Sequence, residues 1–316
     1  MIDPLNRRSF LKMGVAFTAA AAAPRWILAQ SAPSHSMIDQ ARATAANTPV
    51  KTTRLYDNLY LLQGAGGNMA LQTGPQANIL IDASYATAVP HILDAMAAVT
   101  KDAPGTLINT HWHFDHTDGN AGLHAAGFQI VAHQKTRDYL SQDRVMKAFQ
   151  LTVPASPASA LPEITFESSM HLWHNGDSLD LVHFEPAHTD SDIYIHFHNA
   201  DTVHLGDIFF NGFYPFIDES TGGSIGGMIR GAETGLAVAG NNTRIIPGHG
   251  PLASKADLQK YRDMLAAARD KVAALKSSGL TEQETIAKKP TAGSDPIWGR
   301  GFMNGDTFAG LVYRTL

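Results

Sequence analysis

Short runs of alternating apolar and polar residues recur along this chain, and a period of two residues predicts β-strands. Residues 52–62 are expected to form a pair of strands around a turn at Asp57 and Asn58. Turn-forming residues such as Gly74 and Pro75 separate the runs that follow. Further strands are expected at residues 68–73, 78–82, 106–109, 130–131, 164–166, 178–184, 193–198 and 202–205.

Apolar residues at helical spacing predict the helices of the chain. In residues 86–99, for example, Val89, Ile92 and Met96 lie on one stripe. Polar helical turns are expected from about residue 132 to about residue 150, and a loop over 153–161. Other helices are expected at residues 223–239, 256–276 and 306–315. This order of elements predicts an α/β (α+β) fold with two sheets flanked by helices, in one domain over residues 51–316.

The composition excludes several classes of protein. The chain has 316 residues, 44% of them hydrophobic, which is enough for a large core. It has no apolar run of 18 residues, so we expect no stable membrane span. The net charge is −5, and an acidic chain disfavours nucleic acid as a partner. The chain has no cysteine, so a metal site must use His, Asp and Glu.

The first residues have the features of an export signal. Arg7 and Arg8 precede Ser-Phe-Leu-Lys, an apolar run follows over residues 13–23, and small residues surround a cleavage point near residues 29–32. This segment, residues 1–31, resembles a twin-arginine signal peptide. The alternative is an amphipathic N-terminus with two incidental arginines.

The resemblance implies a bacterial protein that folds before the twin-arginine export machinery moves it to the periplasm or out of the cell. Removing residues 1–31 leaves 20 of the 24 basic and 28 of the 29 acidic residues, a net charge of −8. Residues 32–50 are rich in Ala, Ser and Thr and are expected to form a linker.

The strongest chemical signal is a histidine-rich segment after the strand expected at residues 106–109. Its His111, His113 and Asp115 should share a face, because alternate side chains of an extended chain point together. His116 points elsewhere, and a turn into a helix would bring it to the other side of Asp115. Imidazole and carboxylate groups suit zinc, so we expect two histidines to face one ion and an Asp-His pair to face another. The alternative is a weak metal-binding surface.

Three later segments supply further candidate ligands. His188 lies in a turn between two expected strands, and Asp207 follows a strand end. His249 lies between two glycines, which let the backbone bend sharply. Each residue alone is more typical of a turn than of a ligand, but together they complete a metal-binding set.

The string His-Trp-His-Phe-Asp-His resembles the His-x-His-x-Asp-His signature of the metallo-β-lactamase superfamily, and the segments around His188, Asp207 and His249 follow in that superfamily's order. The resemblance implies a four-layer αββα sandwich. It also implies a first metal held by three histidines, a second held by the Asp-His pair with a further histidine, and Asp207 as the bridging ligand. The implied ligands are His111, His113 and His188 for the first ion, and Asp115, His116 and His249 for the second.

The resemblance extends to hydroxyacylglutathione hydrolases and metal-dependent lactonases, which bridge their metals with an aspartate. It departs from the zinc β-lactamases that place a cysteine on the second metal, since this chain has none. We therefore expect a dinuclear zinc hydrolase that cleaves an ester, a thioester, a lactone or a β-lactam of a small-molecule substrate. A metal-bridging hydroxide would attack the carbonyl, and Asp115 would orient it and later shuttle its proton.

Substrate contacts are expected just after Asp207, where aromatic residues are dense. Phe210 would form an apolar lip, and Asn211 or Tyr214 could donate a hydrogen bond to the oxyanion. A plain packed loop is the alternative. Trp112 and Phe114 are expected to pack beneath the site. The pair His196 and His198 has ligand-like spacing, but it sits in a strand without a carboxylate motif and is expected to be structural or solvated.

Three other functions compete with hydrolysis. One is an iron-dependent oxidoreductase of the persulfide dioxygenase type, because iron uses the same ligands as zinc; manganese is a further possibility. A metal-dependent nuclease would need a basic groove, which the acidic charge disfavours. A non-catalytic metal-binding module is the third.

Overall fold

The computed structural model describes residues 35–146, 148 and 150–316. The expected signal peptide, residues 1–31, lies outside the described residues. The described chain contains two large sheets and one two-stranded sheet. The strands of the first large sheet, in spatial order, are β1 (Lys51–Arg54), β2 (Leu59–Gln63), β3 (Met69–Gln72), β4 (Ile79–Ile81), β5 (Thr106–Ile108), β6 (Gln129–His133) and β9 (Ile164–Phe166).

The second large sheet is antiparallel except at one edge, where β13 and β14 run parallel. Its strands, again in spatial order, are β10 (Ser169–His174), β11 (Asp177–His183), β12 (Ile193–Phe197), β13 (Thr202–His204) and β14 (Arg244–Ile246). The small sheet pairs β7 (Arg144–Met146) with β8 (Leu151–Val153). Hairpin β7–β8 replaces the last of the helical turns expected up to residue 150.

The two large sheets pack face to face on alternate apolar residues. In β11, Leu179 and Leu181 are fully buried, whereas Asp180 between them is partly exposed. The same core holds Ile81 of β4 and Ile195 of β12, one from each sheet. Strand alternation thus sends one apolar face of each sheet into a shared middle layer.

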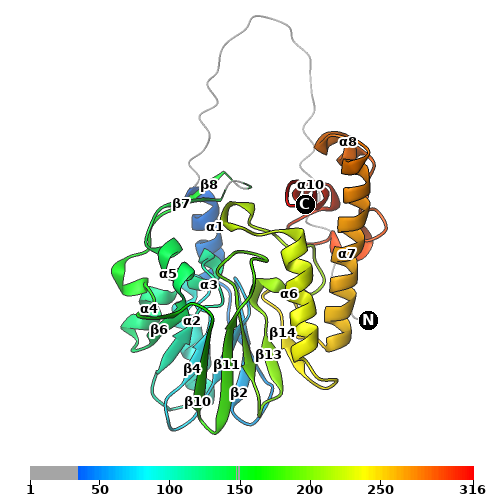
Figure 1. Ribbon diagram of the computed structural model, residues 1–316. Helices are drawn as coiled ribbons and strands as arrows, with labels where there is room; N and C mark the ends of the chain where they lie inside the picture. Colours follow the sequence, from blue (N-terminus) through cyan, green and yellow to red (C-terminus); the bar gives the residue numbers. More distant parts are fainter. Residues whose placement is uncertain (1–34, 147, 149) are drawn as a thin grey trace, which may run out of the picture. The chain divides into compact units, whose positions relative to one another are not determined.

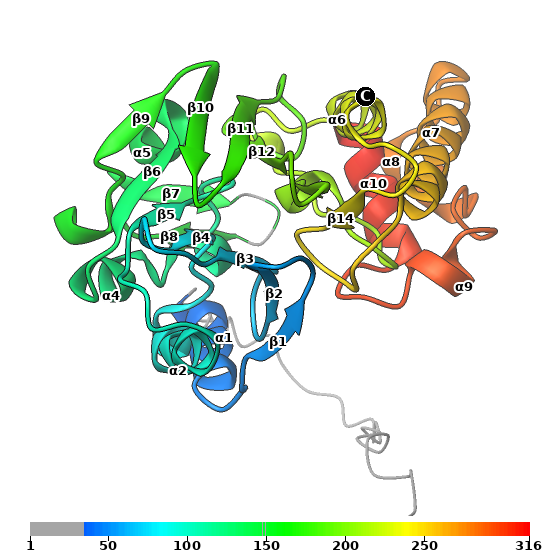
Figure 2. The same cartoon turned by 90° about the horizontal axis from the view of Figure 1, so that it is seen from below.

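Helices cover the outer faces of both sheets. Helix α2 (Val89–Val99) packs with Leu71 and Leu80 of the first sheet, with Ile92 and Met96 on its buried stripe. On the other side, α6 (Ile225–Val238) and α7 (Lys255–Ser277) lie next to β13 and β14 (Figure 1). Figure 2 shows α2 and the pair α6 and α7 on opposite flanks of the sheets. The described chain is therefore a four-layer αββα sandwich, as the sequence predicts.

Of the remaining helices, α1 and α10 have 11 and 10 residues, and the others are shorter. The remaining helices are α1 (His35–Ala45), α3 (Phe114–Thr117), α4 (Asn120–Ala125), α5 (Gln134–Leu140), α8 (Glu282–Ala287), α9 (Asp295–Trp298) and α10 (Gly305–Arg314). The 3-10 turns are η1 (Ala86–Ala88), η3 (Ala158–Ala160), η4 (Gly206–Ile208) and η5 (Glu219–Thr221). Among the described residues, no helix has both the length and the apolar character needed to cross a bilayer.

Helix α1 corrects the expectation that residues 32–50 are a linker. Its Ile38 and Ala45 are buried, and Arg42 donates from Nε and Nη2 to the two carboxylate oxygens of Asp118, at 2.9 and 2.5 Å. A bidentate contact between an arginine and a carboxylate fixes both groups in one geometry. Tertiary contacts with the domain therefore order a segment whose own composition predicts no stable helix.

Candidate metal centre

The histidine-rich segment follows strand β5 of the first sheet. Strand β5 stops at Ile108, and an irregular loop carries His111 before α3 begins at Phe114. His113 precedes the helix, and Asp115 lies in its first turn. The expected extended strand through these residues is thus not formed. The loop and the helix nevertheless separate the candidate ligands into two groups, as the sequence predicts.

The first group contains His111, His113, His188 and Asp207, whose ligand-type atoms lie within 4.8 Å of one another. His113 Nδ1 and His188 Nε2 are 2.9 Å apart, so these two ring nitrogens face the same point. All four side chains are buried. The structure therefore brings residues from three distant parts of the sequence together around one space, where the four side chains could coordinate a single ion.

The second group contains Asp115, His116 and His249, again with ligand-type atoms within 4.8 Å. Asp115 Oδ2 lies 3.2 Å from His249 Nε2 and 3.7 Å from His116 Nε2. The two imidazole nitrogens are 3.4 Å apart. These spacings leave room for one ion with two nitrogen ligands and one oxygen ligand.

The carboxylate of Asp207 lies between the two groups. Its Oδ2 is 3.8 Å from His111 Nε2 and 3.5 Å from His188 Nε2. Its Oδ1 is 3.1 Å from His116 Nε2 and 3.4 Å from His249 Nε2. Each oxygen therefore faces a different group of ligands, which is the arrangement of a bridging carboxylate.

The polar atoms of the centre fit a pair of cations better than they fit each other. His111 Nε2 and Asp207 Oδ1 are buried and have no hydrogen-bond partner among the described residues. An unpaired buried polar atom costs about 1–3 kcal/mol, and coordination of a cation removes that cost. Five imidazoles and two carboxylates are the donor set that zinc prefers where cysteine is absent.

The charge states of His188 and Asp207 suit metal binding, whereas His249 must lose a proton to bind a cation. Burial would lower the pKa of His249, but Asp207 and Asp115 outweigh it and raise that pKa to about 9. Burial, reinforced by the neighbouring His113, lowers the pKa of His188 to about 4, so this imidazole is neutral at pH 7. Burial would raise the pKa of Asp207, but the nearby His249 and His116 outweigh it and hold that pKa well below its usual range. Neutral imidazole and ionised carboxylate are the forms that coordinate cations.

The ring nitrogens that face away from the two groups also have partners. His116 Nδ1 lies 2.7 Å from Asp82 Oδ2, and His113 Nε2 lies 3.2 Å from Asp218 Oδ2. His188 Nδ1 donates to the carbonyl of Phe216 at 2.8 Å. Such contacts fix the orientation of an imidazole and make it a stronger ligand.

The sequence analysis did not identify Asp82 and Asp218. Asp82 directly follows β4, which runs parallel beside β5. The two strands therefore end at the same edge of the sheet, and this position could have indicated that Asp82 lies near the histidines that follow β5. Asp218 lies more than 100 residues from His113, in a segment without a recognisable pattern. Asp190 and Asp192 are the aspartates nearest to His188 in the sequence, but they have other contacts. Asp190 binds Lys135, and Asp192 accepts hydrogen bonds from the His188 turn, so both stabilise local structure.

We expect Asp218→Asn to weaken zinc binding about tenfold. The substitution replaces the anionic acceptor of the His113 Nε2 hydrogen bond with a neutral amide. The substitution preserves shape, so the free energy of unfolding should change far less than after a truncation. Competition with a chromogenic chelator measures the affinity. An unchanged zinc affinity in Asp218→Asn would show that this contact does not tune the ligand.

Two glycines allow the ligands to approach the backbone closely. A Cβ atom at Gly67 would lie 2.1 Å from the His116 ring, and one at Gly248 would lie 2.0 Å from Asp207 Oδ1. Real Cβ atoms do not approach other heavy atoms so closely. The absence of a side chain at these two positions is therefore a steric requirement of the centre.

A cavity of about 630 Å³ opens onto the metal centre. His113, Asp115, Asp207 and His249 form part of its wall. The rest of the wall is largely apolar and includes Tyr85, Phe114, Met146, Phe210, Phe213, Phe216 and Phe302. A concave apolar cavity with a few converging polar groups is typical of a small-molecule site.

Of the three predicted substrate contacts, one lines this cavity and two do not. Phe210 lines it and stacks on His249, with ring centroids 5.1 Å apart. Asn211 does not line it, because its side chain donates to the carbonyl of Pro251. Tyr214 does not line it either: its hydroxyl donates to Asp295 and its ring stacks on Phe308.

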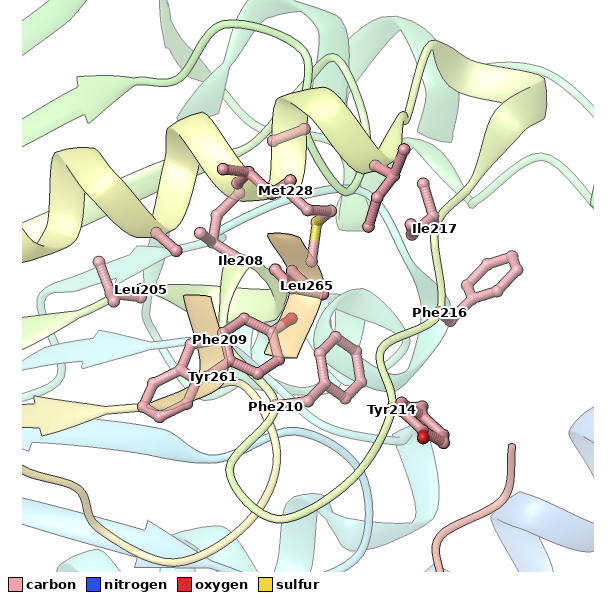
Figure 3. Packing of buried hydrophobic residues seen from close by; sticks show 14 of the residues in the cluster. Leu205, Ile208, Phe209, Phe210, Tyr214, Phe216, Ile217, Met228, Tyr261 and Leu265 are labelled. Atoms are coloured by element: carbon pink, nitrogen blue, oxygen red, sulfur yellow. The ribbon is translucent and has the colours of Figure 1, made fainter. Parts of the chain in front are cut away.

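Figure 3 shows Phe210, Tyr214 and Phe216 along one segment. Trp112 is buried, as expected of a residue beneath the site. Phe114 lines the cavity and was not expected to do so.

Comparison with known families accounts for this geometry. Residues 62–274 match the family model of the metallo-beta-lactamase superfamily. The chain belongs to this superfamily. Comparison with curated protein sequences finds no match.

Solved structures share the metallo-beta-lactamase fold at low sequence identity. A metallo-beta-lactamase from Pontibacter korlensis is 13% identical, with a TM-score of 0.57 over 69% of this chain and 99% of that one. A metallo-beta-lactamase from Cronobacter sakazakii is 19% identical, with a TM-score of 0.58 over 75% and 99% of the two chains. The stereoselective inverting sec-alkylsulfatase Pisa1 from Pseudomonas sp. is 17% identical, with a TM-score of 0.64 over 84% of this chain and half of its own.

Proposed function

We propose that this protein is an exported hydrolase with two zinc ions, and that it cleaves an uncharged ester, thioester or lactone with an apolar substituent. The observation that carries the proposal is the Asp207 carboxylate, which directs one oxygen to each group of ligands. His111, His113 and His188 would hold the first ion, and Asp115, His116 and His249 the second. Bound there, the cations would lower the pKa of bound water toward ~7 and polarise a carbonyl.

Among the protein groups, Asp115 is placed to orient the attacking water. Its side chain is 19% exposed and forms part of the cavity wall. Burial would raise its pKa, but the charge of His116 and the hydrogen bond from His249 lower it to about 2. An ionised carboxylate accepts a hydrogen bond from water readily. We therefore propose that Asp115 orients the attacking water.

The cavity wall supports the choice of substrate class. Phe114, Phe210, Phe213 and Phe216 surround the space next to the ligands, and no Lys or Arg occurs among the described residues that line it. An apolar wall favours a substrate with an apolar group beside its carbonyl. β-Lactams carry a carboxylate, which such a wall leaves without a cationic partner, so they are the least favoured of the classes that the sequence suggests.

The test is a panel of chromogenic esters, thioesters, aliphatic lactones, alkyl sulfates and cephalosporins. We expect hydrolysis of an uncharged lactone, ester or thioester at least about tenfold faster than that of any anionic substrate, since each tenfold step needs only about 1.4 kcal/mol. Chelation should remove the activity, and added zinc should restore it. A preference for cephalosporins would contradict the substrate class. Activity that survives complete chelation would contradict the mechanism, and protein purified with iron and no zinc would favour oxidation.

We also propose export through the twin-arginine route, on the strength of Arg7 and Arg8 in residues 1–31. Replacing both arginines with lysine keeps the charge of the segment. We expect the Arg7→Lys/Arg8→Lys protein to remain in the cytoplasm of a bacterial host while the unchanged chain reaches the periplasm. Fractionation followed by immunoblotting measures this, and equal export of the two proteins would contradict the route.

A further inference from the structure

A second group of histidines lies on the second sheet, away from the metal centre. Strand β12 begins at Ile193, directly after the turn that carries His188, and runs away from that turn. His196 lies near the far end of the strand, and His198 follows directly after the strand ends. The sequence analysis left this pair without a role because no carboxylate accompanies it in the sequence.

The sheet register supplies the missing carboxylate. Asp180 of β11 is directly opposite His196 of β12 and also opposite His171 of β10. His198 lies just past the end of β12 but keeps the pairing, because its backbone N–H donates to the carbonyl of Ser178. Residues directly opposite in neighbouring strands lie on the same face of a sheet. Three strands therefore bring these side chains together.

This group faces away from the core. Leu179, Leu181 and Ile195 alternate with Asp180 and His196 and are fully buried between the sheets. Successive side chains point to opposite faces, so the group lies on the outer face of the second sheet. The side chains of Asp180 and His198 are 35% and 39% exposed, which gives an ion from solvent direct access.

The side chains of this group are close enough to coordinate one ion together. The ligand-type atoms of Asp180, His196 and His198 lie within 4.8 Å of one another. His198 Nε2 is 2.8 Å from Asp180 Oδ2, and the rings of His196 and His198 have centroids 4.1 Å apart. His171 Nδ1 contacts the other oxygen, Asp180 Oδ1. The carboxylate is thus oriented from one side and faces the histidine pair on the other.

The surrounding charges favour a cation. Asp180, Asp201 and Asp177 all act on His196 as negative charges. Imidazole nitrogens near a carboxylate oxygen offer the two kinds of donor atom that zinc, copper(II) and nickel(II) accept in proteins.

We propose that Asp180, His196 and His198 form a separate surface site for a divalent transition-metal ion of the zinc, copper(II) or nickel(II) class, and that His171 positions the carboxylate. Two nitrogen ligands and one oxygen ligand suit these ions, and water completes the coordination. The proposal does not depend on the function of the metal centre. The competing explanation is a ladder of hydrogen bonds that only ties the three strands together.

Metal stoichiometry distinguishes these explanations. Untagged full-length protein is dialysed to equilibrium against zinc, and bound zinc is measured by mass spectrometry. We expect His196→Ala/His198→Ala to bind one zinc fewer than the unchanged chain. The matched control His91→Ala/His124→Ala also removes two imidazoles, from a hydrogen bond to Ala46 and from the neighbourhood of Glu163, and should bind as much as the unchanged chain. Equal zinc in all three proteins would overturn the proposal.

A second variant covers the case in which the double substitution disturbs the fold. Asp180→Asn preserves the shape of the side chain and removes only its charge. We expect it to weaken copper(II) binding at this site at least about tenfold, the scale of effect seen when a metal site loses one supporting group. Copper(II) added to zinc-loaded protein should give an electron paramagnetic resonance spectrum with nitrogen hyperfine coupling. At a copper(II) concentration that half-fills this site in the unchanged chain, that coupling should be several times weaker in Asp180→Asn, and an identical spectrum in both proteins would overturn the proposal.

Discussion

Asp207→Asn is expected to lower kcat/KM about 10³-fold, equivalent to roughly 4 kcal/mol of transition-state stabilisation. Asparagine has the shape of aspartate but only one acceptor oxygen, so it cannot serve both groups of ligands. The distances indicate which ion leaves first. Asp207 Oδ1 approaches His116 and His249 to 3.1 and 3.4 Å, closer than Oδ2 approaches His111 and His188, so the second ion should be lost before the first.

Metal content measured beside activity makes this prediction specific. At the metal centre, leaving aside the surface site of Asp180, we expect Asp207→Asn to retain about one ion where the unchanged chain retains two, because the first group keeps its three histidines. Asp57→Asn is the matched control, since the Asp57 side chain is 89% exposed and forms a surface ion pair with Arg54 at 3.5 Å. Full metal content together with full activity in Asp207→Asn would rule out a bridging role for this carboxylate.

The layers of the fold could be predicted because alternation and helical spacing mark which residues are buried. Strand β11 shows this well: Leu179 and Leu181 face the core, and the pattern alone predicts the strand. Strand β10 was missed because its burial alternates only between exposed and partly buried, so Met170 and Leu172 give a weak signal. Helix α1 was missed because its order depends on a contact between Arg42 and Asp118, 76 residues apart.

The convergence of the candidate ligands could be predicted because four of them, His111, His113, Asp115 and His116, lie close together in the sequence, and a short spacing limits where side chains can point. The residues that support them were harder to predict. Asp82 has a positive φ of 63°, and its carboxylate accepts from Thr110 while it contacts His116. Nothing in the residues around Asp82 indicates this conformation. The Asp180 group shows the same limit, because only strand pairing brings its carboxylate to the histidines.

The cavity residues were predicted least well, for a related reason. Aromatic density after Asp207 correctly indicates an apolar wall at Phe210. It cannot indicate which aromatic side chains turn inward, and Tyr214 turns toward Asp295 and Phe308 instead. A loop residue takes its direction from whichever partner satisfies its polar atom. That partner lies 81 residues further along the chain.

Gly248→Ala is expected to lower kcat/KM about 10²-fold, because it moves the bridging carboxylate without removing any ligand. The new methyl carbon would lie 2.0 Å from Asp207 Oδ1 and 2.7 Å from the backbone carbon and oxygen of Gly206. The Asp207 side chain and the backbone at Gly206 must therefore both shift. Overpacking of this kind costs about 1–3 kcal/mol of folding free energy, which urea denaturation measures.

The control for this prediction is another glycine-to-alanine change. At Gly293 a Cβ atom meets nothing within 4 Å, so Gly293→Ala adds a methyl group to open space. We expect Gly293→Ala to retain activity and stability, because it makes the same chemical change without contact. If Gly248→Ala also retained full activity, Asp207 could move by the width of a methyl group without effect, and its fixed position between the two groups of ligands would not matter for catalysis.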